Sequence, residues 1–281
     1  MPQPNEVLIR VHFAGVNPID WKMRAGFLKN YMPIQLPFIP GIDVSGTVEE
    51  VGSEVKTLKE GQPVFGVAKG VYAEYAVALA ADAAAKPDNL SFDLAATLPV
   101  GALTGWKAVE DAGIKSGQTV VVLSAAGGVG LFAVQFARSK GARVIGTASG
   151  ANLEFVKSLG GENAVDYTKG PLEAEIKEAD VVIDTVGGDA LEQSYGLLKK
   201  GGVLVTVAGQ ISEEKAKEHG LKAMRSGRGP TVNLRMIGEM VAAKTLHAEV
   251  GKVFPLAEAG AAQDLSQTRH GRGRILLRVS P

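Results

Sequence analysis

A run of small residues, Ala125-Ala126-Gly127-Gly128-Val129-Gly130, has the composition and the setting of a turn that holds phosphate groups. It follows an apolar stretch, Thr119 to Leu123, and precedes a segment with helical spacing. A dinucleotide's pyrophosphate needs a tight turn that aims the first amides of a helix at it, and glycines where the backbone comes close. We therefore predict cofactor contacts at Ala126, Gly127, Gly128, Val129 and Gly130. A purely structural turn is the alternative, because position 125 is alanine where the usual GxGxxG pattern has glycine.

The residues that distinguish an NAD site from an NADP site lie about twenty positions further along the chain. NAD sites have an acidic residue there, which binds the ribose hydroxyls. Here the segment 147–153 has no carboxylate, and the first one is Glu154. Ser149 and Asn152 could donate to a 2′-phosphate, with Lys157 as a counter-charge, although helix capping would also explain Ser149 and Asn152. We predict NADPH as the cofactor and favour it over NADH.

The elements around the turn alternate strictly between strand and helix. Apolar runs recur at 120–123, 143–148, 164–167, 181–186 and 203–207, with segments of helical spacing between them. Strands that are apolar on both faces and alternate with helices indicate a doubly wound α/β region with a parallel sheet.

The flanking segments differ from this region. The first ninety or so residues have alternating strands such as Val7 to Val11, and Arg274 to Val279 resembles them more than it resembles the middle of the chain. Ser212 to Gly229 is polar and basic, and we predict a mobile loop with some helix there. Val232 to Ala243 has helical spacing.

Composition excludes several classes of function. Thirty basic residues balance thirty acidic ones, which gives no reason to expect nucleic acid or a membrane surface as partner. The absence of cysteine excludes disulfides, a thiolate nucleophile and Cys-ligated zinc. The four histidines lack metal-ligand spacing, and no GxSxG elbow or Walker loop occurs.

Two further stretches have simple interpretations. The charge-free residues 120–137 are predicted to be a strand, a glycine turn and a helix, not a membrane span. The basic cluster of Arg269, Arg272, Arg274 and Arg278 has no aromatic residues for RNA stacking, so we predict a solvated strand face. The first ten residues show no secretory signal, and we expect a cytoplasmic protein.

Motifs along nearly the whole chain resemble those of the medium-chain dehydrogenase/reductase family. They are Asn17-Pro-Ile-Asp20, Pro40-Gly-Ile-Asp-Val-Ser-Gly-Thr-Val48, Gly61-Gln-Pro-Val64, Leu103-Thr-Gly-Trp106, the glycine turn, Asp166-Tyr167 and Gly271-Arg-Gly-Arg-Ile275. The chain is similar in particular to zinc-independent quinone oxidoreductases (the zeta-crystallin-like branch) and to alkenal and enone reductases. Zinc members carry Gly-His-Glu where this chain has Gly41-Ile42-Asp43, so we expect no metal site.

This resemblance implies a GroES-like, β-rich catalytic domain at 1–97, to which 246–281 return, and a Rossmann NADP-binding domain at 98–245. It places the active cleft at their junction, and it implies a truncated or short N-terminus, because relatives begin earlier with another strand. The implied cofactor contacts, besides the glycine turn, are Thr104, Ser149, Asn152, Tyr167, Thr185, Val186, Ala208 and Gly209. The implied substrate-side residues are Asn17, Asp20, Arg24 and Tyr31, although Asp20 and Arg24 could equally form a structural ion pair.

The implied reaction is hydride transfer from NADPH to a quinone, or to the C=C bond of an α,β-unsaturated carbonyl, without a metal. Asn17 could stabilise the charge that develops on the carbonyl oxygen, and Tyr31 or water could deliver the proton. An enoyl-thioester reductase, weakly suggested by Asn30-Tyr31, and an idle NADPH-binding sensor or structural protein stay open as alternatives. The resemblance further implies a homodimer with a small-molecule substrate.

Overall fold

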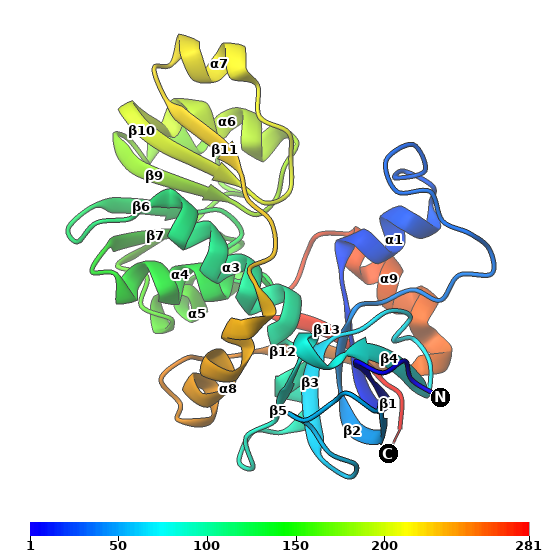
Figure 1. The fold of residues 1–281 in the computed structure, drawn as a ribbon. Helices are drawn as coiled ribbons and strands as arrows, with labels where there is room; N and C mark the ends of the chain where they lie inside the picture. Colours follow the sequence, from blue (N-terminus) through cyan, green and yellow to red (C-terminus); the bar gives the residue numbers. More distant parts are fainter. Residues whose placement is uncertain (281) are drawn as a thin grey trace. The chain divides into compact units, whose positions relative to one another are not determined.

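The computed structural model describes residues 1–280, and the chain divides into two compact units (Figure 1). Unit 1 comprises Met1–Leu103 and the chain from Pro230 onwards, and unit 2 is Thr104–Gly229. The breaks therefore lie at 103/104 and 229/230, not after 97 and 245 as we predicted. The first break falls inside one helix, α3 (Leu98–Ala112).

The second break lies early because helix α8 (Leu234–Ala242) packs within unit 1. A Cβ on Gly238 would stand 2.7 Å from Cζ of Phe65, so the helix backbone rests directly on that ring. The helical spacing at 232–243 is confirmed, but periodicity alone could not show which core this helix covers.

Unit 1 is built on a seven-stranded sheet with the order β12-β13-β1-β2-β3-β5, in which β4 also pairs with β1. Its strands are β1 (Glu6–Val16), β2 (Asp43–Val51), β3 (Pro63–Val67), β4 (Tyr75–Leu79), β5 (Ala83–Ala85), β12 (Val250–Pro255) and β13 (Arg274–Arg278). The α-helices besides α8 are α1 (Pro18–Arg24), α2 (Phe92–Ala96), the first part of α3, and α9 (Ala259–Gln267); short 3-10 helices are η1 (Ala80–Asp82), η4 (Thr231–Asn233) and η5 (Leu256–Glu258). The predicted alternation is confirmed, because Val7, Ile9 and Val11 are all fully buried in the core of this unit.

The last strand returns to the sheet of the opening segment, as predicted, and lies there beside the first strand. β13 pairs antiparallel with β1, where Phe13 faces Arg278 and Val16 faces Ile275, and parallel with β12. In Figure 1 the red β13 lies next to the blue β1.

Unit 2 is built on a six-stranded sheet with the order β11-β10-β9-β6-β7-β8, in which every pairing is parallel. The strands are β6 (Thr119–Val122), β7 (Arg143–Ala148), β8 (Asn163–Asp166), β9 (Ala179–Asp184), β10 (Leu198–Thr206) and β11 (Lys222–Arg225). Besides the rest of α3, the helices are α4 (Gly130–Ser139), α5 (Leu153–Ser158), α6 (Asp189–Leu197), α7 (Glu213–Glu218), η2 (Gly150–Asn152) and η3 (Leu172–Ala174). This confirms the doubly wound α/β fold.

The segment 212–229 is more regular than predicted, since it contains α7 and β11. β11 is the edge strand of the sheet, and its four residues are half-buried or exposed. An edge strand with polar faces lacks the apolar run on which our prediction relied.

The charge-free stretch 120–137 divides into β6, a turn and α4, as predicted. Among residues 1–280, no helix combines the length and the apolar character that crossing a membrane requires.

Candidate functional site

The glycine turn of unit 2 lies where the strand order of the parallel sheet reverses, since β6 has β7 on one side and β9 on the other. Ligands of doubly wound sheets bind at this switch point, outside the carboxyl ends of the strands. The backbone N–H of Ser124 donates to Oγ1 of Thr147 at 3.2 Å, and that of Ala125 to the carbonyl oxygen of Thr147 at 2.8 Å. The turn is therefore fastened to the end of β7.

Glycine is required where the helix leaves this turn. A Cβ on Gly130 would stand 2.1 Å from the carbonyl oxygen of Ser124, which no side chain could tolerate without a backbone shift. Ser124 itself has a φ of 52°, an uncommon conformation for a residue other than glycine. The close approach aims the start of α4 across the end of β6.

The start of α4 has the donors that an anion needs. The N-cap residue, Val129, makes no side-chain capping bond. The amides of Leu131 and Phe132 donate to the carbonyl oxygens of Gly127 and Val129 at 3.0 and 3.1 Å, so the amides that could meet an anion are those that precede them, from 128 to 130. The first turn of α4 also has no acidic residue, so its partial positive charge is not offset locally. Gly127, Gly128 and Val129 are partly exposed beside it. These residues fit a pyrophosphate.

Ser149 and Asn152 lie together directly after β7. Nδ2 of Asn152 donates to Oγ of Ser149 at 3.1 Å, and neither side chain caps a helix. Both residues stand at N-cap positions, of η2 and α5, as the capping interpretation expected, but the capping hydrogen bonds are absent. Both polar side chains are half-exposed at the carboxyl edge of the sheet. Tyr167 follows β8 at the same edge, where its backbone N–H donates to the carbonyl oxygen of Ala148 at 3.3 Å.

A carboxylate that sequence reasoning missed lies near this edge. Asp166, the last residue of β8, accepts hydrogen bonds from the hydroxyl and the amide of Thr168 at 2.7 and 3.0 Å, and these bonds hold its pKa below the usual range. A Cβ on Gly150 would stand 2.8 Å from Oδ2 of Asp166. The candidate counter-charge, Lys157, forms an ion pair with Glu154 at 2.9 Å. Asp166 stood in the Asp166-Tyr167 motif, but only the pairing of β8 with β7 brings its carboxylate close to Gly150.

The loops after β9 and β10 carry four of the predicted cofactor contacts, Thr185, Val186, Ala208 and Gly209, and all four are partly exposed. The hydroxyl of Thr185 donates to the carbonyl oxygen of Leu123 at 2.8 Å, which joins the first loop to the start of the glycine turn. A Cβ on Gly187 would stand 2.9 Å from the carbonyl oxygen of Ala208, so the two loops touch. Thr104 is buried on α3, next to Gly105, whose Cα faces the first turn of α4.

In unit 1, two of the predicted substrate-side residues are buried together. Asn17 and Asp20 are only 1% and 2% exposed. Oδ2 of Asp20 accepts from the amide of Asn17 at 2.8 Å and from the hydroxyl of Tyr72 at 2.9 Å, and burial raises the pKa of Asp20.

Both polar atoms of the Asn17 side chain form hydrogen bonds within unit 1. Its Nδ2 donates to Oδ2 of Asp43 at 3.0 Å, and its Oδ1 accepts from Arg274 at 2.8 Å. Arg274 and Asp43 also form an ion pair in which both side chains are buried. Our prediction that Arg274 lies on a solvated strand face is therefore wrong, because its buried partner comes from a strand 231 residues away.

The other two predicted substrate-side residues lie at the surface. Arg24 pairs with Asp264 at 2.7 Å, so the alternative of an ion pair between Arg24 and Asp20 is wrong. Tyr31 is 85% exposed, in the long connection between α1 and β2. No group of three or more His, Cys, Asp or Glu side chains that could hold a metal ion occurs in the described part of the chain.

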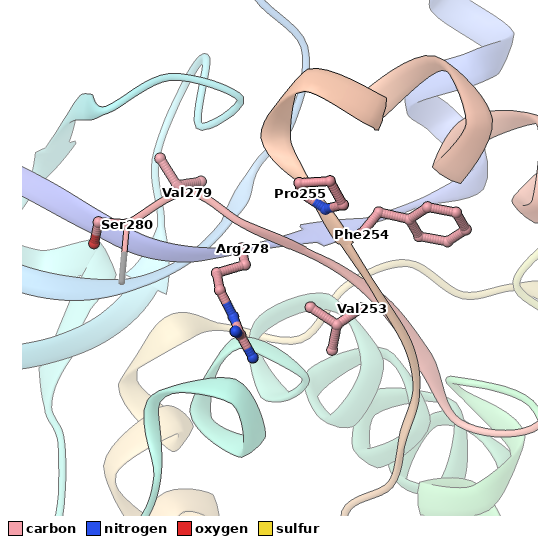
Figure 2. A pocket seen from close by; sticks show the side chains of 6 residues that line it. All are labelled: Val253, Phe254, Pro255, Arg278, Val279 and Ser280. Atoms are coloured by element: carbon pink, nitrogen blue, oxygen red, sulfur yellow. The ribbon is translucent and has the colours of Figure 1, made fainter.

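A hollow of about 480 Å³ on unit 1 is lined by none of the predicted cofactor or substrate-side residues. Figure 2 shows its lining side chains, which are Val253, Phe254, Pro255, Arg278, Val279 and Ser280. The Arg278 guanidinium lies 5.6 Å from the centre of the Phe13 ring, so this side chain is held by a cation–π contact.

Two protein families match the chain. Residues 3–88 match the alcohol dehydrogenase GroES-like domain, and residues 128–248 match the zinc-binding dehydrogenase family. The chain is 40% identical over 220 residues to the 2-methylene-furan-3-one reductase of Solanum lycopersicum, which covers 74% of this chain and 56% of that protein, less than two thirds of its length.

Two further relatives match over nearly the full chain. The NADPH-dependent alkenal/one oxidoreductase, chloroplastic, of Arabidopsis thaliana is 32% identical, over 99% of this chain and 73% of that one. The solved structure of the quinone oxidoreductase from Coxiella burnetii is 37% identical and superposes with a TM-score of 0.90, over 100% of this chain and 92% of that one. With the GroES-like and Rossmann units described above, these matches show that the chain belongs to the medium-chain dehydrogenase/reductase family, in the branch that contains quinone oxidoreductases and alkenal/one oxidoreductases.

Proposed function

We propose that this chain is an NADPH-dependent oxidoreductase that transfers hydride to a quinone, or to a C=C bond conjugated with a carbonyl, without a metal ion. The observation that carries the proposal is the approach of Gly130 to the carbonyl oxygen of Ser124. Only glycine permits it, and it directs the uncapped start of α4 at the switch point of the sheet. The names of the three relatives, which reduce an enone, an alkenal or a quinone, support the substrate class.

The preference for NADPH rests on Ser149 and Asn152. Their hydroxyl and amide groups lie half-exposed directly after β7, where an NAD site would present a carboxylate. Asp166 opposes this preference, because its negative charge lies next to Gly150. Its carboxylate, however, is engaged by Thr168. We therefore propose that the enzyme prefers NADPH but also accepts NADH.

When bound, the nicotinamide ring supplies the hydride. The chain's own contribution in unit 2 is to bind and orient: the turn at 125–130 binds the pyrophosphate, and the loops after β9 and β10 contact the nicotinamide half. Accurate positioning of the reacting atoms is itself a large part of catalysis in such reactions.

In unit 1, we propose that Asn17 and Asp20 support the substrate site without touching the substrate. Both are buried, and the amide group of Asn17 already bonds to Asp43 and Arg274. The two residues form the capping box at the start of α1, and the connection that follows this helix carries the exposed Tyr31. Tyr31 or water then delivers the proton.

The proposal that no metal takes part rests on the donor groups themselves. The chain has no cysteine. Asp43, which stands in the segment that holds the Gly-His-Glu motif of zinc relatives, accepts hydrogen bonds from Arg274, from Asn17 and from the amide of Val100. A cation there would have to displace a buried guanidinium, which is unfavourable.

The test is a binding measurement followed by a substrate panel. NADPH and NADH affinities are measured by calorimetry for the natural chain and for Gly128→Asp, which forces a carboxylate against the pyrophosphate. Turnover is then measured with 1,4-quinones, alkenals and enoyl thioesters. We expect NADPH to bind, Gly128→Asp to lose it, and quinones or alkenals to be reduced. A chain that binds neither nucleotide would refute the proposal, and a chain that reduces only thioesters would change the substrate class.

A further inference from the structure

Two buried side chains, Asp184 and Thr206, join the loops that follow β9 and β10, and no sequence motif pointed to either of them. Both are fully buried. Oδ1 of Asp184 accepts from the amides of Val186 and Gly187 at 2.9 and 3.0 Å, and Oδ2 accepts a second, longer bond from Gly187 at 3.2 Å. One carboxylate thus holds the loop after β9.

The same carboxylate reaches the second loop through Thr206. The Thr206 hydroxyl donates to Oδ2 of Asp184 at 2.6 Å. Because its proton is used in this way, its oxygen lone pairs face the following loop, where they accept from the amides of Ala208 and Gly209 at 3.2 and 3.1 Å. The backbone adds one more link, from the amide of Val207 to the carbonyl oxygen of Asp184 at 2.9 Å.

The direction of these bonds makes the two side chains a unit. A carboxylate only accepts, so the hydroxyl of Thr206 must donate to it. If an asparagine stood at position 184, its side-chain nitrogen could not accept a hydrogen bond from the Thr206 hydroxyl. If an apolar residue stood at position 206, the backbone amides of Ala208 and Gly209 would lose their acceptor. Removal of the Asp184 carboxylate or of the Thr206 hydroxyl therefore disturbs both loops.

The amides held in this way belong to residues that we propose as cofactor contacts. Val186, Ala208 and Gly209 are partly exposed, whereas Asp184 and Thr206 lie behind them. The bonded pair is therefore placed to fix the loops and not to touch the ligand.

We infer that Asp184 and Thr206 are positioning residues that preorganise the loops for the nicotinamide half of the cofactor, independently of the adenosine half. The inference rests on the proposed function. Ser149, Asn152 and Tyr167, which are our candidates for the adenosine half, follow β7 and β8 on the other side of β6. The two halves of the cofactor should therefore respond differently to changes at position 206.

The experiment compares Thr206→Val, which keeps the shape and removes the hydroxyl, with Thr206→Ser, which keeps the hydroxyl. Affinities are measured by calorimetry for NADPH and for 2′,5′-ADP, which lacks the nicotinamide half. We expect Thr206→Val to weaken NADPH binding about tenfold, the effect of unsatisfied buried donors, and to leave 2′,5′-ADP affinity unchanged. Thr206→Ser should match the natural chain with both ligands.

Two further variants distinguish a loss of loop positioning from unfolding of unit 2. Thr206→Cys keeps the size and accepts hydrogen bonds only weakly, so it should give an intermediate loss of NADPH affinity. Asp184→Asn should weaken NADPH in the same selective way. Retained 2′,5′-ADP binding shows that a variant is folded.

The outcomes separate this inference from the proposed function. Equal losses for NADPH and 2′,5′-ADP across the folded variants, or NADPH affinity unaffected by Thr206→Val, would overturn the positioning role alone. A natural chain that binds neither ligand would overturn the proposed function and this inference with it.

Discussion

The buried ion pair between Arg274 and Asp43 gives the sharpest test of how unit 1 is held together. Arg274→Met removes the guanidinium and keeps much of the side-chain volume. The Asp43 carboxylate then stays fully buried without a cationic partner from residue 274, while Nδ2 of Asn17 and the amide of Val100 still donate to it, each at 3.0 Å. Removing one partner of a buried pair costs about 3–5 kcal/mol, a large part of the ~5–15 kcal/mol that stabilises a typical domain.

The assay can report on each unit separately, because each contains one tryptophan: Trp21 in unit 1 and Trp106 in unit 2. Urea unfolding is followed by fluorescence in a Trp106→Phe background, where the buried Trp21 reports on unit 1 alone, and in a Trp21→Phe background for unit 2. We expect Arg274→Met to lower the unfolding midpoint reported by Trp21 and to leave the one reported by Trp106 in place.

A matched control is Arg24→Met, which breaks an exposed Arg–Asp pair of unit 1. The side chains of Arg24 and Asp264 are 44% and 68% exposed, so this loss should cost only about 0–1 kcal/mol. Replacing both buried partners, as Arg274→Met with Asp43→Asn, should restore part of the stability, because no uncompensated charge remains. The reasoning is refuted if Arg274→Met and Arg24→Met destabilise unit 1 equally.

Three further predictions concern the glycine turn, a buried carboxyl and metal independence. Gly130→Ala places a Cβ 2.1 Å from the Ser124 carbonyl oxygen. Such overpacking costs about 1–3 kcal/mol, so this variant should weaken NADPH binding, measured by calorimetry, by about tenfold or more. The control is Gly196→Ala in α6, where the nearest neighbour of the added Cβ lies at 3.6 Å and the NADPH affinity should not change. The pKa of Asp20 is raised in the folded state, so the folded state binds the proton of this carboxyl more tightly than the unfolded state does. The protonated carboxyl therefore contributes to the unfolding free energy below about pH 4, and this contribution is lost as the pH rises through the folded pKa. Asp20→Asn should therefore flatten the decline in unfolding free energy from pH 4 to 8, and parallel curves for the two chains would contradict this. Prolonged dialysis against EDTA, with metal content checked by mass spectrometry, should leave turnover unchanged; a loss restored by Zn²⁺ would contradict the proposed chemistry.

The doubly wound unit could be predicted from sequence because its signals are local. The apolar run before Ala125, the glycines after it and the helical spacing from Val129 onwards lie within twenty residues, and strand, turn and helix follow one another in the structure. The same holds for β13, whose alternation matched that of the opening strands.

The features that could not be predicted depend on partners distant in sequence. Arg274 is buried because Asp43 balances its charge, and the residues near position 274 give no indication of that partner. Arg24 likewise pairs across 240 positions with Asp264. Asp184 and Thr206 match no motif, and their importance arises only when β9 and β10 become neighbours. β11 was not predicted, because an edge strand can form without the apolar run by which we identified the other strands.

The position of β13 in its sheet imposes an order of events on a chain emerging from the ribosome. All of unit 2 is synthesised before residue 230, whereas β1 keeps the edge at Phe13–Val16 unpaired until residues 274–278 arrive. The nascent chain therefore presents an open strand edge, a template for aggregation, for more than two hundred further residues of synthesis. A stop codon shortly before residue 274 would leave that edge open permanently, while every residue of unit 2 would still be present.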